Sequence, residues 1–576
     1  MSAYWKVDDT MRIGQKFISI PSENGLEYSE NQKIQLFVDP STKYMDGHNT
    51  YLEFNVKLNL PAGTPTPTRL QLDEMGAECL IKNIRIYDGT RGQLLEELDS
   101  YSSLCSVRYD YDADDSIRNY RALREGSSVW TPSNRGTEGT SKTAMANTIT
   151  NPYFKVKQGN QNASWVDSDF ITAKVCIPLW TGIFAQNEHI FPVMMTNGLY
   201  LEIDTSPARE VIKQLDSVLR YRRPKLNPWF HSANGSTTMP ANASDVQTFY
   251  IQQKNNLSGS DAVSRFPFVV GEKFGFCSAT APETGTNLSG TFHISEINLS
   301  SNGLIEVKTN ASFQNNGASA VAVTQDFVMY STAVSGDASY NATYTISNVN
   351  LVVSQVELDP SYEKGMLQKV REGKAIEIDI LTATNYKNSI LASDRQTTYQ
   401  VYATNSRAKS LLVIPQDSQV YSAKDAISGT GTYEILKNGN GDDGMLTSNR
   451  SGYTGICDEL QEIQYQLEGR LVPSRAINVS KIASRASIDA FHLYELEKCL
   501  DNAGIVPRSF RAFQNNFIFG RGFAVNDGAI DLRGKDLAVI LKYTGDAAPA
   551  KPKLFNSFVI HVRRFMIRDG GVEVIA

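Results

Sequence analysis

Histidine is the first residue type to test for chemistry, because it serves as a general base and as a metal ligand near neutral pH. The six histidines are scattered and form no His-Glu-x-x-His pair. The chain also lacks a Gly-x-Ser-x-Gly elbow and a Gly-Lys-Ser/Thr phosphate loop. Ser361-Tyr-Glu-Lys364 matches Ser-x-x-Lys, but its partner motifs are missing. We therefore expect no enzyme and no cofactor; the histidines are His48, His189, His231, His293, His492 and His561.

An alternating acidic run, Asp110, Asp112 and Asp114, is similar to the start of a calcium loop. An EF-hand loop needs glycine at its sixth position and glutamate at its twelfth, where this chain has Asp115 and Arg121. A solvated acidic loop is therefore the expected structure. None of the six cysteines forms a Cys-x-x-Cys pair, which argues against structural zinc. We expect no metal site, and cysteines that behave as small buried apolar side chains in a reducing compartment.

Charge and targeting signals narrow the class of protein. The net charge is −6 over 576 residues, which argues against a dedicated nucleic-acid binder. The densest basic run, residues 220–225, is interpreted as an inter-subunit salt-bridge patch or a solvated loop rather than a phosphate site. The N-terminus has no apolar signal core, and no stretch reaches the roughly 18 apolar residues that span a bilayer. The sequence predicts a soluble protein made in the cytoplasm.

Period-two alternation of apolar and polar residues predicts a largely β protein. Residues 52–60 alternate without a break, and residues 199–203 do the same after an Asn-Gly turn. Between Pro178 and Asn197 lies a loop too apolar to be solvated. Residues 231–350 are rich in Asn, Ser, Thr and Gly and poor in charge, which is typical of a β-rich surface insertion. Asn-x-Ser/Thr sequons cluster there by composition, at Asn234, Asn242, Asn256, Asn287, Asn298, Asn310 and Asn341.

Helical spacing is confined to short stretches of the chain. Apolar residues predict short helices over 94–101 and 209–215, a helix or linker over 360–373, and the clearest helix over 487–500, with Ser487 as its N-cap. Residues 460–471 are predicted to form one strand that ends at Pro473. Residues 105–170 and 428–452 are predicted to be long loops.

Four blocks of the chain carry a resemblance to a known family. They are Ile177-Pro-Leu with Phe191-Pro and Gly198-Leu-Tyr-Leu-Glu-Ile203, the strand and turn from Ile84 to Tyr101, the element from Gln464 to Arg475, and the C-terminal strands around Leu532–Leu537 and His561–Val574. In this order they resemble the double jelly-roll major capsid proteins of eukaryotic double-stranded DNA viruses, closest to those of virophages and polinton-like viruses. The resemblance covers roughly residues 30–220 and 345–576 and leaves the insertion unassigned.

The resemblance implies an all-β fold of two consecutive eight-stranded jelly rolls, with short helices and long β-rich loop insertions. The expected organisation is an N-terminal arm over 1–30, a first jelly roll over 31–358 with a surface insertion at about 226–343, and a second jelly roll over 359–576. Segments rich in short strands with frequent turns favour sandwiches or barrels independently of the resemblance.

The function that the resemblance implies is that of a virion coat subunit. Three chains would form a pseudo-hexameric capsomer and tile an icosahedral shell, with a penton protein and minor or cement proteins as further partners. No sequence-specific nucleic acid is expected, and the N-terminal arm is the candidate for contact with an inner membrane. The alternative is a viral fibre or adhesion protein with a carbohydrate-binding β-sandwich; an enzyme on a β scaffold is disfavoured by the missing catalytic constellation.

Overall fold

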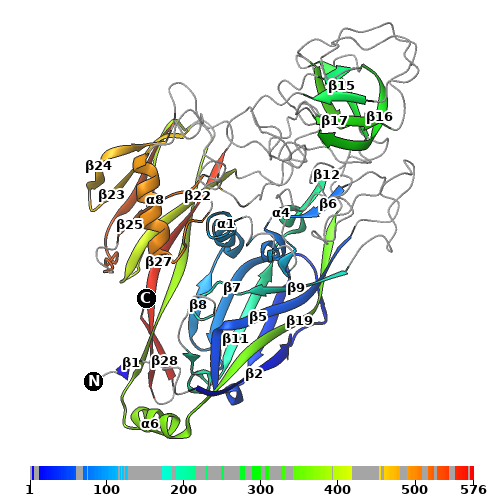
Figure 1. Cartoon of the computed structure of the whole chain (residues 1–576). Helices are drawn as coiled ribbons and strands as arrows, with labels where there is room; N and C mark the ends of the chain where they lie inside the picture. The colour runs from blue at the N-terminus through cyan, green and yellow to red at the C-terminus, as the bar shows by residue number, and fades with distance from the viewer. Residues whose placement is uncertain are drawn as a thin grey trace.

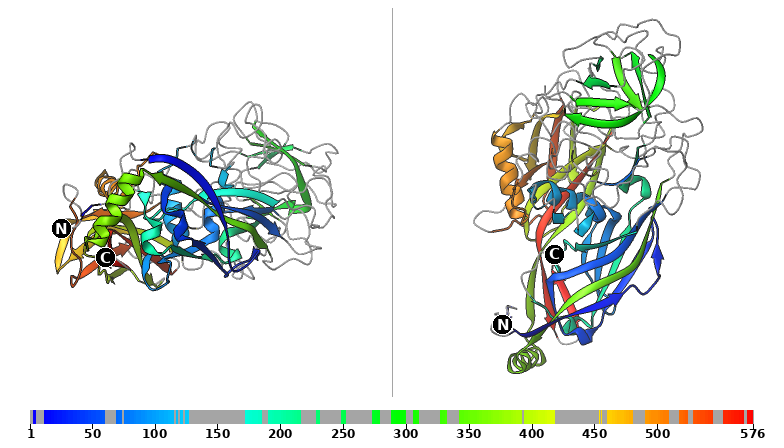
Figure 2. Two further views of the ribbon diagram at one scale, coloured as in Figure 1. Left: turned by 90° about the horizontal axis from the view of Figure 1, so that it is seen from below. Right: turned by 45° about the vertical axis from the view of Figure 1, so that its right-hand side comes forward.

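The computed structural model describes residues 3–4, 12–59, 69–73, 75–114, 117, 120–121, 124–126, 172–184, 190–215, 228–230, 248–251, 273–278, 288–299, 305–309, 327–331, 342–391, 394–417, 453, 455, 460–479, 490–508, 517–523, 528–543, 552–568 and 571–575. Its strands gather into two sandwiches that lie side by side (Figures 1 and 2). A separate sheet lies at one end of the molecule. The helix α6 (Pro360–Arg371) lies at the other end, together with the first described residues.

The first sandwich has the strand order of a jelly roll. When its eight principal strands are numbered along the chain, one sheet reads 1-8-3-6 and the other reads 2-7-4-5, the order produced by two Greek keys. The first sheet contains β2 (Arg12–Pro21), β19 (Thr343–Leu358), β5 (Tyr44–Asn59) and β9 (Thr172–Pro178). The second contains β4 (Lys33–Val38), β11 (Leu199–Thr205), β7 (Ile81–Asp88) and β8 (Leu94–Leu98).

The second sandwich repeats the same order. Its 1-8-3-6 sheet contains β20 (Ile376–Ile390), β27 (Lys553–Arg568), β22 (Ala408–Asp417) and β25 (Phe519–Gly522). Its 2-7-4-5 sheet contains β21 (Gln396–Val401), β26 (Leu537–Tyr543), β23 (Leu460–Leu467) and β24 (Arg470–Asn478). The chain is therefore an all-β, double jelly-roll protein, as the sequence predicts.

Helices occupy equivalent places in the two rolls. In each roll a helix follows the fifth strand, α1 (Tyr101–Tyr111) after β8 and α8 (Ala490–Asn502) after β24. The helix α6 joins the last strand of the first roll to the first strand of the second. Asp359 caps it by accepting from the backbone N–H groups of Ser361 and Tyr362, and Met366 and Val370 form its buried side. Of the two alternatives predicted at 360–373, a helix or a linker, the structure shows the helix.

Shorter strands extend these sheets or, in the case of β6 and β12, form a separate two-stranded sheet. Most add to the first roll or to the C-terminal end of the second, and β1 pairs with β20 in parallel, whereas the pairings inside both rolls are antiparallel. The bounds are β1 Ala3–Tyr4, β3 Glu27–Tyr28, β6 Arg69–Leu72, β10 Ile190–Phe191, β12 Ile212–Leu215 and β28 Gly571–Ile575, with the four-residue helix α4 at Ala208–Val211. Single 3-10 turns stand at Pro40–Thr42, Gly76–Leu80 and Val193–Thr196.

The insertion between β11 and β19 contains a separate antiparallel sheet, as its composition predicts. The sheet has the order β13-β14-β17-β16-β15-β18. Its strands are β13 (Pro228–Phe230), β14 (Thr248–Ile251), β15 (Lys273–Ser278), β16 (Leu288–Leu299), β17 (Ile305–Thr309) and β18 (Phe327–Ser331).

Several local predictions are wrong. Residues 12–21, predicted to belong to an N-terminal arm, form β2, which pairs along its length with β19. The helix predicted at 94–101 is strand β8, because it pairs with β7, and the helix begins only at Tyr101. Residues 209–215 divide between α4 and β12. The strand predicted at 460–471 turns back at Glu468-Gly469, so Pro473 lies inside β24 of a hairpin.

The apolar core explains why the rolls stay together. The larger apolar cluster includes Leu36 and Phe54 of the first roll as well as Ile378, Leu412 and Phe565 of the second. A smaller cluster lies entirely within the second roll. Because one cluster runs through both rolls, burial of apolar surface and not only the covalent link at α6 holds them side by side.

Candidate interaction surfaces

The seam between the two rolls contains a fully buried carboxylate. Glu96 of β8 accepts hydrogen bonds from the backbone N–H groups of Gly182 (2.6 Å) and Ile183 (3.1 Å). It also accepts from the hydroxyl of Thr382 on β20, in the second roll, at 2.6 Å. Burial raises the pKa of Glu96, and these three donors offset part of that effect. One side chain of the first roll is therefore anchored to the second roll through a buried carboxylate.

Further contacts fix the spacing of the rolls at the same place. Arg563 of β27 donates to the backbone carbonyl of Leu95 at 2.6 Å. A Cβ added at Gly182 would lie 2.6 Å from the Leu381 carbonyl oxygen, so only glycine allows this approach. Phe191 meets Phe565 edge to face, with ring centroids 6.2 Å apart.

Helix α1 lies inside the seam, and all of its residues are buried. The second roll covers it through three polar contacts. Ser103 Oγ accepts from Gln416 of β22 at 3.4 Å, Ser106 donates to the Tyr453 carbonyl at 3.1 Å, and the Tyr111 carbonyl accepts from the backbone N–H of Arg508 at 2.7 Å. The helix that follows the fifth strand is thus a docking element between rolls.

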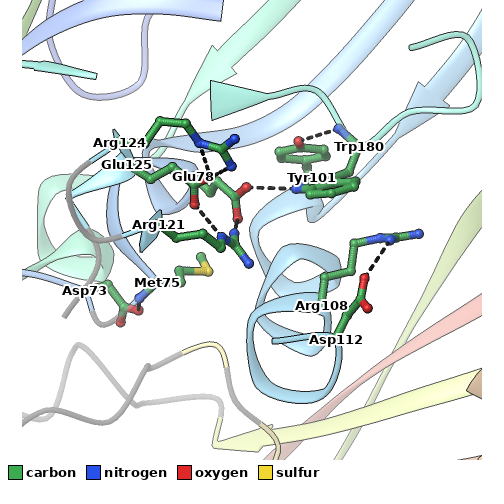
Figure 3. A network of polar contacts seen from close by, with 10 residues as sticks. All are labelled: Asp73, Met75, Glu78, Tyr101, Arg108, Asp112, Arg121, Arg124, Glu125 and Trp180. Atoms are coloured by element: carbon green, nitrogen blue, oxygen red, sulfur yellow. Dashed lines mark hydrogen bonds and ion pairs between the residues drawn. The ribbon is translucent and has the colours of Figure 1, made fainter. Parts of the chain in front are cut away.

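A buried ion-pair network supports α1 from the side of its own roll (Figure 3). Arg121 lies between two fully buried carboxylates, donating to Glu78 at 3.0 Å and to Glu125 at 2.6 Å. Glu78 also accepts from the indole N–H of Trp180 at 2.8 Å, and the backbone N–H of Trp180 donates to Tyr101 of α1 at 2.9 Å. The network joins three separated segments of the chain to the helix.

Electrostatics in this network follow from burial. Desolvation raises the pKa of Glu78 to about 7, against the opposing effect of Arg121. Burial alone would lower the pKa of Arg121, but Glu78 and Glu125 together raise it above its ordinary value. Arg121 is therefore a permanent cation between two carboxylates, and Arg124 supplies a second cation to Glu125. The network is built for structure, since all of its groups satisfy one another.

The equivalent helix of the second roll is covered on one side only by the described part of the chain. Tyr494 of α8 is 56% exposed, whereas only five residues of α8 are buried: His492, Glu495, Leu496, Cys499 and Leu500. Leu471 of β24 and Val506, just after the helix, are also exposed apolar side chains. The same element is thus fully covered in the first roll and open in the second.

The residues singled out from the sequence do not come together into a site. His561 is buried on β27, and its Nε2 lies 3.0 Å from Thr384 Oγ1. Asp112 contacts Arg108 and Arg508, while Asp110 is buried in α1. Within the described part of the chain, no cluster of His, Cys, Asp or Glu could hold a metal, and no helix is long and apolar enough to cross a membrane. The cysteines whose side chains are described form no disulfide: Cys79, Cys105, Cys176 and Cys499.

The other candidates from the sequence either lie in ordinary structural positions or fall outside the described residues. Ser361 lies in the first turn of α6 beside Asp359, and Lys364 is exposed on the same helix. Asn298 lies on β16 and donates to Glu296. The basic run 220–225, the loop 428–452, Ser487 and the other six sequons lie outside the described residues. Sequence reasoning missed the pairing of Glu96 and Glu78 with partners that are distant in the chain. The one local signal for this network was the i, i+4 spacing of Arg121 and Glu125, which is typical of an ion pair on a helix.

Comparison with known proteins gives matches among solved structures alone. No protein-family model and no curated protein matches the chain. The Faustovirus major capsid protein is 9% identical, with 98% of this chain and 92% of that chain covered and a TM-score of 0.47. The PBCV-1 virus capsid is 11% identical, with 100% and 99% covered and a TM-score of 0.45, and the Sputnik virophage structure is 8% identical, with 100% and 90% covered and a TM-score of 0.44. The chain is similar to these over nearly its whole length; the fold assignment itself rests on the strand order described above.

Proposed function

We propose that this chain is the major capsid protein of a double-stranded DNA virus, and that three copies form a pseudo-hexameric capsomer. The observation that carries the proposal is the contrast between the two equivalent helices. Within one chain, α1 of the first roll is buried against the second roll, where it contacts β22 of the sheet β20-β27-β22-β25. On the second roll, α8 has the same place in the strand order and is open. A second copy supplies the missing cover.

The partner surface follows from the equivalence of the rolls. Gln416 stands near the end of β22, the third strand of the second roll, and contacts α1. The third strand of the first roll is β5, so we expect the end of β5 in the next copy to cover α8. This contact joins two different surfaces and is heterologous, so it generates a ring when the rotation closes.

Ring closure sets the number of chains. In this proposal, the contact between the two rolls of one chain and the contact between rolls of neighbouring chains have the same geometry. Each rotates one roll relative to the next by the same angle. Six such steps of one sixth of a turn close a ring, and three chains supply the six rolls. A hexagonal outline tiles a flat facet, which gives the mechanism of a shell protein without any catalytic residue. The vertices need a different, penton protein.

The long axis of the molecule gives the capsomer two distinct ends. The insertion sheet β13–β18 lies at one end, and α6 and β1 lie at the other (Figures 1 and 2). We assign the insertion to the outer surface of the virion, because sheets inserted between two roll strands can vary without disturbing the core. The opposite end then faces the interior, where minor capsid proteins or an inner membrane are its partners.

The remaining parts of the proposal follow from the same architecture. The proposed domain organisation is a first roll up to residue 358, with the insertion at about 226–343, and a second roll from residue 359. The chain acts in the virion after synthesis in the host cytoplasm. It encloses nucleic acid without reading its sequence and has no enzymatic activity.

A pair of matched tyrosine variants tests the proposal. Tyr494→Arg places a charge in the middle of the open α8 surface, whereas Tyr402→Arg places the same charge at another exposed tyrosine of the second roll, beyond β21. A hot-spot loss of about 2 kcal/mol weakens association roughly 30-fold. We expect Tyr494→Arg to give folded monomers by light scattering and Tyr402→Arg to keep the trimer. A trimer that is indifferent to Tyr494→Arg contradicts the assignment, and glycan binding by a stable monomer supports the fibre or adhesion alternative.

A further inference from the structure

Strand β2 leaves one edge of the first roll open. It stands at the end of its sheet and pairs only with β19 among the described residues. It is ten residues long, and alternate residues of an edge strand direct their backbone N–H and C=O groups away from the sheet. Such an edge is a template for another extended segment.

The side chains on this edge are unusually apolar for a solvent-facing strand. Ile13 and Phe17 are 61% and 59% exposed. They stand four residues apart and therefore on the same face of the strand. Gln15 lies between them and donates to Ser354 Oγ of β19 at 2.6 Å, so its polar head is turned back to the sheet. The two apolar side chains form a short stripe that this chain leaves uncovered in the part the structure describes.

Charge along β2 has one sign. The strand contains Arg12 and Lys16 and no acidic residue. Glu357 of β19 lies against Gly14, 3.1 Å from where a Cβ would stand, so it offsets charge at the start of the strand only. Lys16 is exposed and has no ion pair with any residue that the structure describes. A carboxylate on a bound segment could form an ion pair with Lys16.

The second roll shows what such an edge accepts. Its first strand, β20, is the equivalent of β2, and its outer edge is paired by β1 over Ile376 and Glu377. The first-strand edge of this fold thus takes up an added extended segment. On the first roll the same position has no occupant in the described chain.

We propose that β2 binds an extended segment of a different protein by β-addition. The segment covers Ile13 and Phe17 with apolar side chains on one face and pairs a carboxylate with Lys16 on the other. We assign the occupant to a different protein because of where β2 lies. Its first residue, Arg12, pairs with Leu358 beside the start of α6, at the end of the molecule away from the insertion. The proposed function turns that end toward the virion interior, where other proteins bind. The contact between copies proposed above uses α8 and leaves this backbone edge open. The inference therefore deepens the proposed function by giving the chemistry of an internal partner.

A synthetic peptide probes the edge directly. The probe is the fluorescent nine-residue peptide Ser-Val-Glu-Val-Thr-Val-Glu-Val-Ser, titrated with the full-length protein and followed by anisotropy. Its controls are the same peptide with lysine in place of glutamate and a version methylated on alternate backbone nitrogens. We expect the glutamate peptide to bind at least tenfold more tightly than either control, because only it has both the backbone donors and the matching charge.

Variants on exposed positions complete the test. Ile13→Thr with Phe17→Ser should weaken binding at least tenfold, Lys16→Glu should reverse the preference between glutamate and lysine peptides, and Leu26→Ser, at another exposed apolar residue, should change nothing. Equal binding of the methylated peptide, or no preference reversal with Lys16→Glu, overturns the inference. If the Ile13→Thr/Phe17→Ser variant instead loses its oligomeric mass, the edge belongs to another copy of this chain. The peptide preferences are measurable on a monomer, so their failure is distinct from failure of the capsomer proposal.

Discussion

His561 provides a sharp test of the electrostatics inside the second roll. Its side chain is buried on β27, with Thr384 Oγ1 3.0 Å from Nε2. Burial, with a further contribution from Arg563, lowers its pKa from 6.5 to about 3. The folded protein therefore keeps this histidine neutral under conditions where the unfolded chain protonates it. Stability from this group is complete above pH 6.5 and is lost as the pH falls toward 3.

The magnitude follows from the two pKa values. At pH 5 the group is 1.5 pH units below its unfolded pKa, and one unit is worth about 1.36 kcal/mol, so the loss relative to pH 7.5 is about 2 kcal/mol. The perturbation is His561→Gln, which keeps a polar group near Thr384 and removes the titration. The assay is urea unfolding at pH 7.5 and pH 5, followed by tryptophan fluorescence and circular dichroism.

The variant should lose about 2 kcal/mol less than the wild type over this pH interval, whatever its stability at pH 7.5. The matched control is Thr384→Val, which removes the hydrogen-bond partner but keeps the histidine; it should lower stability at both pH values and retain the wild-type pH dependence. If His561→Gln and the wild type lose stability equally between pH 7.5 and 5, the reasoning about burial is wrong.

Three further outcomes test the seam and its support. Glu96→Ala removes the shared acceptor of three buried donors and should cost about 3–5 kcal/mol, while Glu96→Gln should cost about 1–3 kcal/mol, both measured by calorimetric unfolding. Gly182→Ala forces a Cβ to within 2.6 Å of the Leu381 carbonyl and should increase hydrogen exchange in β20 and β8; unchanged protection there would contradict the close approach. Arg121→Met leaves Glu78 buried without its cation, while Arg124 still pairs with Glu125, and should cost about 3–5 kcal/mol at pH 8; because the pKa of Glu78 is already raised, the cost should shrink as the pH falls and Glu78 takes up a proton.

The strands were predictable because alternation records burial on one face. Residues 52–59 and 199–203 alternate cleanly in sequence, and they form the end of β5 and most of β11; in β5 one side chain in two is buried, and in β11 Tyr200 is buried as well. The two rolls could be expected from the family-like blocks, since the blocks fall on strands that the topology places in order. The helix at 360–373 was also predictable, because its apolar residues have helical spacing and its end is capped by Asp359.

Two of the failures are explained by where the strands lie in their sheets, whereas the one at 460–471 comes from the local turn at Glu468-Gly469. Leu94, Leu95 and Leu98 fit one face of a helix, but β8 pairs with β7 and packs against the second roll, which buries Glu96 next to Leu95, so its apolar pattern carries no period of two. Residues 12–21 show weak periodicity because β2 is an edge strand with exposed apolar residues.

Candidate site residues were harder to predict than the fold. An interface between rolls is formed by residue types that are common on protein surfaces. Their structural role depends on partners that are distant in the sequence. Glu96 resembles a surface glutamate until Thr382, 286 residues away, is placed beside it. The open surface of α8 cannot be distinguished in sequence from the buried surface of α1, because the difference lies in which roll covers it. Catalytic motifs are local, and their absence could therefore be judged from the sequence, whereas assembly surfaces could not.

The mass of the purified protein in solution, with negative-stain images of the same peak, tests the central claim most directly. We predict a mass of three chains, about 191 kDa from the 63.8 kDa chain, and rings with six similar lobes. A protein that stays at 63.8 kDa at high concentration and in varied salt contradicts the claim that α8 is covered by a second copy.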